Sequence, residues 1–120
     1  MVNKEKAYRV VGCCMEVHSK LGAGLLENCY HNALYYELKA TGFSVGYNVP
    51  YNVFYKGQQV GEYYADLVVD SEIIIELKST KALSQAHVAQ LINYLHISGC
   101  RLGLLVNFQG SSLEWRRIII

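Results

Sequence analysis

The sequence predicts an α/β fold, with one mixed β-sheet that carries helices on its faces. Three observations predict this class. Apolar residues recur at helical spacing over the first 40 residues, the spacing changes to two from residue 43 onward, and one later helical segment separates two strongly apolar runs. The predicted order of elements is therefore αα-ββββ-α-ββ. Because a helix crossover joins the two apolar runs, we expect their strands to be parallel neighbours.

Two helices are predicted at the start of the chain. Asn3 is a suitable N-cap for a helix over 4–21, in which apolar side chains recur every three or four positions. A Gly-Ala-Gly run at 22–24 ends this helix. A second amphipathic helix is expected over about 25–40, with Gly42 as its C-terminal stop.

Strands and turns make up most of the remaining chain. Pro50 marks an edge or a break between two expected strands, and Lys56-Gly57 turns the chain into the next one. Ser84 can cap a third helix, and Gly99 closes it. The expected segments are strands 43–49, 51–55, 60–69 and 73–78, helix 85–97, and strands 102–108 and 113–120.

The bulk properties are those of a single globular domain over residues 1–120. Hydrophobic residues make up 52% of the chain and charged residues 18%, a balance that excludes a disordered chain. No apolar run reaches the roughly 18 residues of a membrane span, and the first six residues lack the apolar segment of a signal peptide. We therefore expect a cytoplasmic protein with no membrane partner.

Net charge and cysteine spacing narrow the functional classes further. A net charge of +1 is weak support for nucleic-acid binding, so any phosphate-binding surface must be local or assembled by oligomerisation. The cysteines have no C-x-x-C spacing, and we expect reduced, buried side chains rather than a zinc site. They are Cys13, Cys14, Cys29 and Cys100.

Charged residues interrupt the most strongly apolar strand of the chain. The triplet 73–75 is Ile-Ile-Ile, typical of a strand buried on both faces, and Glu76 and Lys78 continue the same run. Residues two apart in a strand point to one face, so Glu76 and Lys78 stand side by side. A short hairpin can bring Asp66 opposite them. The sequence thus predicts two carboxylates and an ammonium group on one patch.

Such a patch fits metal-dependent hydrolysis. Two adjacent carboxylates repel unless a cation or a proton neutralises them, and hard ions such as Mg²⁺ take oxygen ligands of this kind. Lys78 could orient or deprotonate a water for attack on a phosphodiester while the metal stabilises the developing charge. The alternative is an ordinary Glu-Lys pair at a strand end, because Glu-x-Lys is a common tripeptide.

Residues on the predicted helices are candidate companions of this patch. Glu27 lies in the first turn of the second helix, where an acid favours the helix dipole, or where it could be a third metal carboxylate. Gln90 and Tyr94 are four apart on the third helix, either as its polar flank or as groups that hold a phosphate or a water. We expect His18, His31 and His96 to have structural or surface roles.

Four motifs, spread over nearly the whole chain, are similar to those of one family. They are Gly24-x-x-Glu27-x-x-Tyr30, Glu16-Val17-His18 before Leu21-Gly22, Asp66 with Glu76-Leu77-Lys78, and the run 104–108. Together they resemble the GxxExxY family, which is assigned to the PD-(D/E)xK nuclease superfamily. One departure is Ala65, which stands where the superfamily pattern has proline.

This resemblance implies a restriction-endonuclease-like core and assigns roles to the candidate residues. Asp66 and Glu76 become metal-binding acids, Lys78 the catalytic lysine and Glu27 an additional helix acid. Gln90-x-x-x-Tyr94 is similar to a motif of the exonuclease-like branch that lies beside the same centre.

The expected function is Mg²⁺- or Mn²⁺-dependent hydrolysis of nucleic-acid phosphodiesters, with DNA as the expected substrate. The alternative is a non-catalytic nucleic-acid-binding or protein-interaction module that retains the fold. A homodimer that closes over a duplex is a further hypothesis. We expect Trp115 and the apolar tail 118–120 to be exposed for such an interface.

Overall fold

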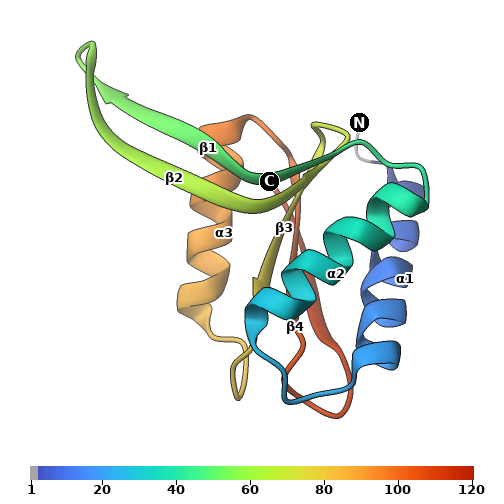
Figure 1. Ribbon diagram of the computed structural model, residues 1–120. Helices are drawn as coiled ribbons and strands as arrows, with labels where there is room; N and C mark the ends of the chain where they lie inside the picture. Colours follow the sequence, from blue (N-terminus) through green and yellow to red (C-terminus); the bar gives the residue numbers. More distant parts are fainter. Residues whose placement is uncertain (1–2) are drawn as a thin grey trace.

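A five-stranded mixed sheet forms the middle of the molecule, with two helices on one face and one on the other (Figure 1). The computed structural model describes residues 3–120. Its elements are α1 (Lys4–Leu21), α2 (Glu27–Ala40), β1 (Val45–Tyr55), β2 (Gln58–Val69), β3 (Ile73–Lys78), α3 (Gln85–Ser98), β4 (Leu102–Asn107) and β5 (Glu114–Ile119). Their order confirms the predicted α/β class.

The strands lie in the order β1-β2-β3-β4-β5, so neighbours in sequence are neighbours in the sheet. All pairs are antiparallel except β3 and β4, which are parallel because α3 crosses over between them. This parallel pair confirms the prediction drawn from the two apolar runs.

Capping side chains set the helix ends close to the predicted positions. The Asn3 side chain accepts a hydrogen bond from the Lys6 N–H at 3.0 Å at the start of α1. At the start of α3, Ser84 and His87 exchange side-chain-to-backbone hydrogen bonds, and left-handed Gly99 ends that helix. Helix α2 begins at Glu27, two residues later than predicted, because Leu26 is still extended.

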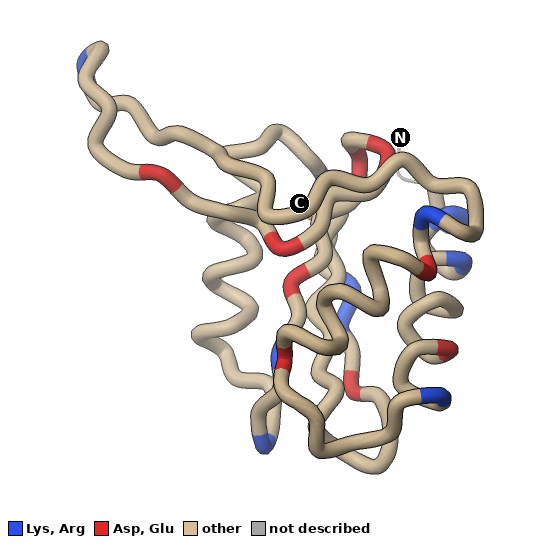
Figure 2. The backbone as a smooth tube through the Cα atoms, viewed as in Figure 1, with Lys and Arg blue, Asp and Glu red and all other residues tan. Residues whose placement is uncertain are grey.

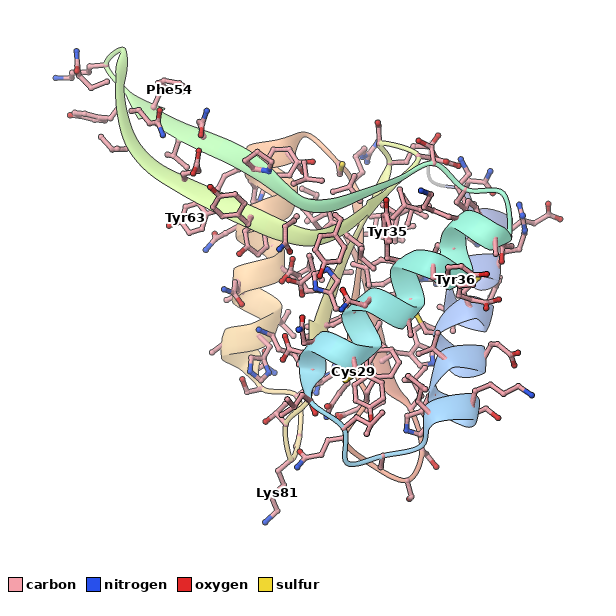
Figure 3. The ribbon with its side chains drawn as sticks, in the orientation of Figure 1. Cys29, Tyr35, Tyr36, Phe54, Tyr63 and Lys81 are labelled. Carbon is pink, nitrogen blue, oxygen red and sulfur yellow. The ribbon has the colours of Figure 1, made fainter. Side chains whose placement is uncertain are left out.

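Of the two alternatives predicted at Pro50, the sheet edge is confirmed and the break is wrong, because β1 is one continuous edge strand from Val45 to Tyr55. Strand β1 lies at the edge of the sheet and pairs only with β2. Its outer side has no partner strand among the described residues, and an edge strand of this kind tolerates proline, which has no N–H to donate. The outer part of the β1–β2 hairpin extends beyond the helices as an arm (Figure 1), with Phe54 near its tip (Figure 3).

The sheet separates two apolar clusters, and β3 contributes to both. Ile73, Ile75 and Leu77 face α1 and α2, whereas Ile74 faces α3. All four are at most 1% exposed, which confirms the strand buried on both faces. Glu76 and Lys78 therefore project on the α3 side of the sheet, as alternation from Ile74 requires.

Two expectations about exposure are wrong in part. Trp115 is half-buried against the α1–α2 side of the core, and Ile118 and Ile120 pack against the α3 side, because β5 pairs with β4 instead of standing free. Cys29 is exposed on α2, while the other three cysteines are buried and all four are free thiols.

Within residues 3–120, no helix is long and apolar enough to cross a membrane.

Candidate active site

The candidate site lies where β2 and β3 separate. The two strands pair only through 67–69 and 73–75. Beyond Ile75, β3 remains paired with β4 as far as Lys78, while β2 turns away into the arm with β1. Asp66 and Glu76 are the first residues past the last pair, so they face each other across the opening between the strands.

Side chains replace the missing ladder at this fork. The Asp66 N–H donates to Glu76 Oε1 at 3.0 Å, and the Leu77 N–H donates to Asp66 Oδ2 at 2.8 Å. Each carboxyl group thus bonds to the backbone of the opposite strand, and charged groups make the stronger hydrogen bonds of this kind. This reciprocal arrangement holds the two carboxyl groups close together.

Burial makes Glu76 an unusual acid. The residue is only 4% exposed, and this burial, followed by the charge of Asp66, raises the pKa of Glu76 to about 8. The Asp66 N–H and the charge of Lys78 act in the opposite direction but do not offset it. A divalent cation between the two carboxyl groups would remove this cost, so the pair fits a hard, oxygen-binding metal.

Lys78, Gln90 and Tyr94 lie beside the acid pair, as the sequence predicts. Lys78 Nζ donates to Gln90 Oε1 at 3.4 Å, which links the end of β3 to α3. Tyr94 lies one turn further along α3, where burial first and then the charges of Glu76 and Asp66 raise its pKa to about 12. Helix α3 therefore supplies the polar wall of the site.

Tyr30 explains how Glu27 reaches the site. Its hydroxyl donates to the Gly22 carbonyl at 2.6 Å and accepts from the Leu25 N–H at 3.1 Å, while its ring stacks on Phe108 at 4.7 Å. The tyrosine thus fixes the loop before α2, in which Gly24 has a φ of 97° that favours glycine. Glu27 follows as the first residue of α2.

Glu27 is exposed but lies within reach of the charge of the acid pair. Partial loss of hydration and then the charge of Asp66 raise the pKa of Glu27, while Lys78, the Ser79 N–H and His31 oppose the rise. Among residues 3–120, however, no three His, Cys, Asp or Glu side chains are grouped as a ready-made metal cage. The described site is therefore an acid pair with Glu27 beside it, and Glu27 as a third ligand stays a prediction.

Sequence reasoning did not connect His31 with the site. Its Nε2 lies 2.8 Å from the Asp66 carbonyl oxygen, to which it must donate, and its ring stacks on Tyr47 at 4.1 Å. The available signal was spacing: His31 follows Glu27 by four residues and so shares its face of α2.

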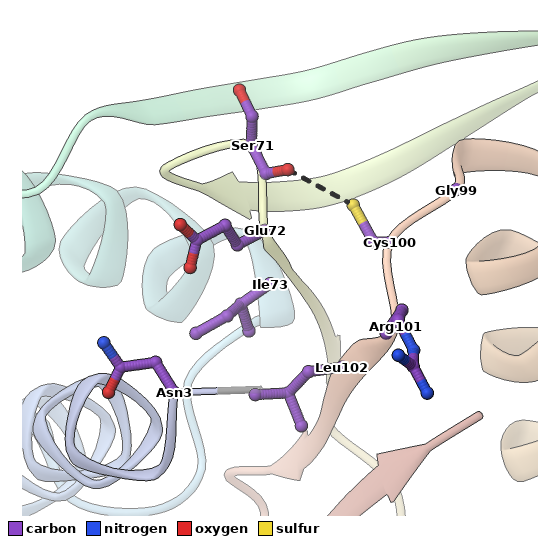
Figure 4. Close-up of a pocket in the computed structure, with 8 residues that line it drawn as sticks. All are labelled: Asn3, Ser71, Glu72, Ile73, Gly99, Cys100, Arg101 and Leu102. Atoms are coloured by element: carbon purple, nitrogen blue, oxygen red, sulfur yellow. Dashed lines mark hydrogen bonds between the residues drawn. The ribbon is translucent and has the colours of Figure 1, made fainter. Parts of the chain in front are cut away.

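A separate pocket of about 170 Å³ lies at the other end of β3 and β4 (Figure 4). Ser71, Glu72, Arg101 and Leu102 are among the residues that line it. These residues lie at or before the starts of the two parallel strands, whereas Glu76 and Lys78 lie toward the carboxyl end of β3, where open α/β sheets usually bind ligands. This pocket is therefore not part of the acid site.

The chain matches the family model described as PD-(D/E)XK nuclease superfamily over residues 4–118. It belongs to this superfamily. Among solved structures, this PD-(D/E)XK chain is similar to one titled "Crystal structure of SSO0001", with a TM-score of 0.63 and 22% identity. The match covers 78% of this chain and 50% of the other, so it supports the fold alone. No curated protein gives a match.

Proposed function

We propose that this PD-(D/E)XK protein is a metal-dependent nuclease that hydrolyses phosphodiester bonds in DNA. The observation that carries the proposal is the pair of hydrogen bonds that holds Asp66 and Glu76 together at the fork, with Lys78 on the same face as Glu76. Hydrolysis adds water to phosphorus, breaks one P–O bond and leaves a proton on the departing oxygen. These steps need positive charge and an oriented water.

The residues divide this work among them. Asp66 and Glu76, with Glu27 as the third ligand, would hold Mg²⁺ or Mn²⁺, which when bound acts as a Lewis acid toward the phosphoryl oxygens. Lys78 would orient the attacking water or neutralise charge on the phosphate. Gln90 and Tyr94 would position a substrate oxygen or a water. Gln90 accepts a hydrogen bond from Lys78, and Tyr94 lies close enough to the acids for their charges to raise its pKa.

A cleavage assay with matched variants tests this proposal. We expect purified protein to cut single- or double-stranded DNA with Mg²⁺ or Mn²⁺, and to lose that activity with EDTA. Glu76→Gln and Lys78→Met should each lower the rate by about 100-fold or more, since each removes a charge next to the scissile phosphate. Tyr36→Phe, on the exposed side of α2 (Figure 3), is the control. Equal activity in Glu76→Gln and the control would reject the proposal.

A non-catalytic module that retains the fold is the second candidate. The net charge of +1 favours it, because a surface that grips many phosphates needs more cations. Calorimetry separates the two candidates: failure of the chain to bind Mg²⁺ or Mn²⁺ at millimolar concentration would favour the module. Substrates in the assay should include RNA, so that a different nucleic-acid preference is also detected.

We further propose that residues 1–120 form one nuclease-like domain of the GxxExxY family, supported by the way Tyr30 fixes the loop that precedes Glu27. A homodimer closing over a duplex has its best candidate surface at edge strand β5, where Ile119 is 48% exposed. Sedimentation at tens of micromolar, a concentration of the order used to detect useful association, would show a monomer if this is wrong.

A further inference from the structure

Asp66 is held in place by side chains on both sides of its backbone. Its N–H donates to the Glu76 carboxylate, and its carbonyl accepts from His31 Nε2 at 2.8 Å. In the regular register, Asp66 would pair with Asn48, but that pair is missing although residues on both sides of it are paired. Asn48 has a φ of 49°, which is incompatible with a regular strand.

Both strands change the face that they present at this point. Tyr47 stacks on His31 of α2, whereas Val49, two residues later, packs into the cluster on the α3 side. On β2, Leu67 belongs to the α1–α2 cluster and Ala65 to the α3 cluster. Residues two apart in a regular strand share a face, so the β1–β2 ribbon is twisted at Asn48 and Asp66. The conformation of Asp66 therefore depends on contacts outside the ladder.

His31 is well fixed for such a role. It is 8% exposed, and its ring lies nearly parallel to that of Tyr47, with an interplanar angle of 8°. His31 also stands one helical turn after Glu27, on the same face of α2. The position of α2 against the sheet therefore sets both the acid of Glu27 and the hydrogen-bond donor of His31.

We propose that His31 is a positioning residue that, through the Asp66 carbonyl, aims the Asp66 carboxylate at the metal site. This inference rests on the proposed function, in which Asp66 binds the metal. Groups that orient metal ligands typically contribute about 10- to 100-fold to metal affinity. His31 would act in this way through the ligand's backbone, and we expect a loss near the lower end, about tenfold.

His18 provides a matched control. It is also a buried histidine on a helix, 9% exposed, and its Nε2 donates to the Gly110 carbonyl at the same distance of 2.8 Å. His31→Phe and His18→Phe each remove one histidine-to-carbonyl hydrogen bond and keep an aromatic ring. His31→Gln, whose amide can still donate, is the conservative variant.

Two measurements on the full chain decide the matter. Calorimetric titration with Mn²⁺ should show about tenfold weaker binding for His31→Phe, partial recovery for His31→Gln and no change for His18→Phe. In metal-free protein, amide hydrogen exchange at Leu77, whose N–H donates to Asp66 Oδ2, should be faster only in His31→Phe.

Equal Leu77 exchange and equal Mn²⁺ affinity in the two phenylalanine variants would overturn the role of His31. Failure of the wild-type protein to bind Mn²⁺ would instead overturn the proposed function. In that case, Leu77 exchange still shows whether His31 fixes Asp66, because that measurement needs no metal.

Discussion

At the scale of single residues, Glu76 combines burial with a neighbouring acid, and both raise its pKa from the ordinary 4.5 to about 8. Between these values the folded protein binds more protons than the unfolded chain, so stability falls as the pH rises. In EDTA, we expect this group to lower the free energy of unfolding by up to about 1.4 kcal/mol per pH unit in that window. Urea unfolding from pH 5 to 8.5 measures this slope.

Glu76→Gln should flatten this pH dependence, because glutamine is neutral throughout and can still accept from the Asp66 N–H. The raised pKa of Glu27 adds a contribution of the same sign, so some slope remains. Glu16→Gln, at an exposed position on α1, serves as the control. A Glu76→Gln protein with the same slope as that control would show that Glu76 does not titrate in this window.

The hydroxyl group of Tyr30 holds the loop that precedes Glu27. Tyr30→Phe keeps the stacking on Phe108 but removes the hydroxyl that bonds to Gly22 and Leu25. We expect about 1–3 kcal/mol of lost stability from the two unmet backbone groups. We also expect weaker cleavage than in Tyr36→Phe, because the loop before Glu27 loosens. Urea unfolding at pH 7 and the cleavage assay check this, and an unchanged stability would contradict it.

At the scale of elements, the packing of α3 on β4 depends on one glycine. A Cβ at Gly103 would lie 2.9 Å from three side-chain atoms of Leu91, which is closer than non-bonded carbon atoms approach one another in proteins. Gly103→Ala should therefore destabilise the protein by about 1–3 kcal/mol, the range seen for overpacked cores. It should also weaken activity, because α3 carries Gln90 and Tyr94.

Gly12→Ala is the matched substitution in an open position. Apart from its chain neighbours and the backbone of its own helix, no atom lies within 4 Å of a Cβ at Gly12, so the change should stabilise α1 by about 0.5–1 kcal/mol. Thermal unfolding of both variants checks the pair. Similar shifts of the same sign would mean that Leu91 moves freely away from β4.

The β1–β2 arm carries exposed aromatic side chains close to the site. Tyr63, on β2 (Figure 3), is 46% exposed. Its ring meets that of Tyr94 edge-on, with the ring centroids 5.8 Å apart. Tyr94 in turn lies close enough to Glu76 for that charge to affect its pKa. Through the contact between Tyr63 and Tyr94, the β1–β2 arm adjoins the polar side chains that α3 presents to the site.

At the scale of the whole molecule, acidic and basic residues are spread over many elements instead of forming one basic face (Figure 2). Lys78 stands at the site, and Lys81 follows it in the loop before α3 (Figure 3). Few phosphates can then be neutralised, and we expect the logarithm of DNA affinity to fall with a slope of about −1 to −3 against the logarithm of salt concentration.

Fluorescence anisotropy with Glu76→Gln, which should bind DNA without cutting it, measures this slope. Lys81→Ala should make it shallower by about 1 if that side chain contacts a phosphate. Arg9→Ala, on α1 where the guanidinium lies over Phe43, should leave it unchanged. A slope steeper than about −5 would instead indicate a broad basic surface, for example one assembled from two copies.

Local patterns in the sequence determined the fold class, the order of elements, the caps at Asn3, Ser84 and Gly99, and the buried strand at 73–75. These follow from spacing and backbone preferences between near neighbours, which a single sequence displays. They also placed Glu76 and Lys78 on one face of β3. The sequence left open whether Pro50 marks an edge or a break, and the predicted exposure of Trp115 was wrong, because each depends on which strand lies alongside.

Only the tertiary structure decided how the site is held. The fork between β2 and β3, the exchange of hydrogen bonds between Asp66 and Glu76, and the reach of His31 to the Asp66 carbonyl join residues up to 35 positions apart. Such contacts depend on where two strands stop pairing and where a helix is docked. Neither is encoded in local periodicity, because both result from how the two apolar clusters pack against the sheet.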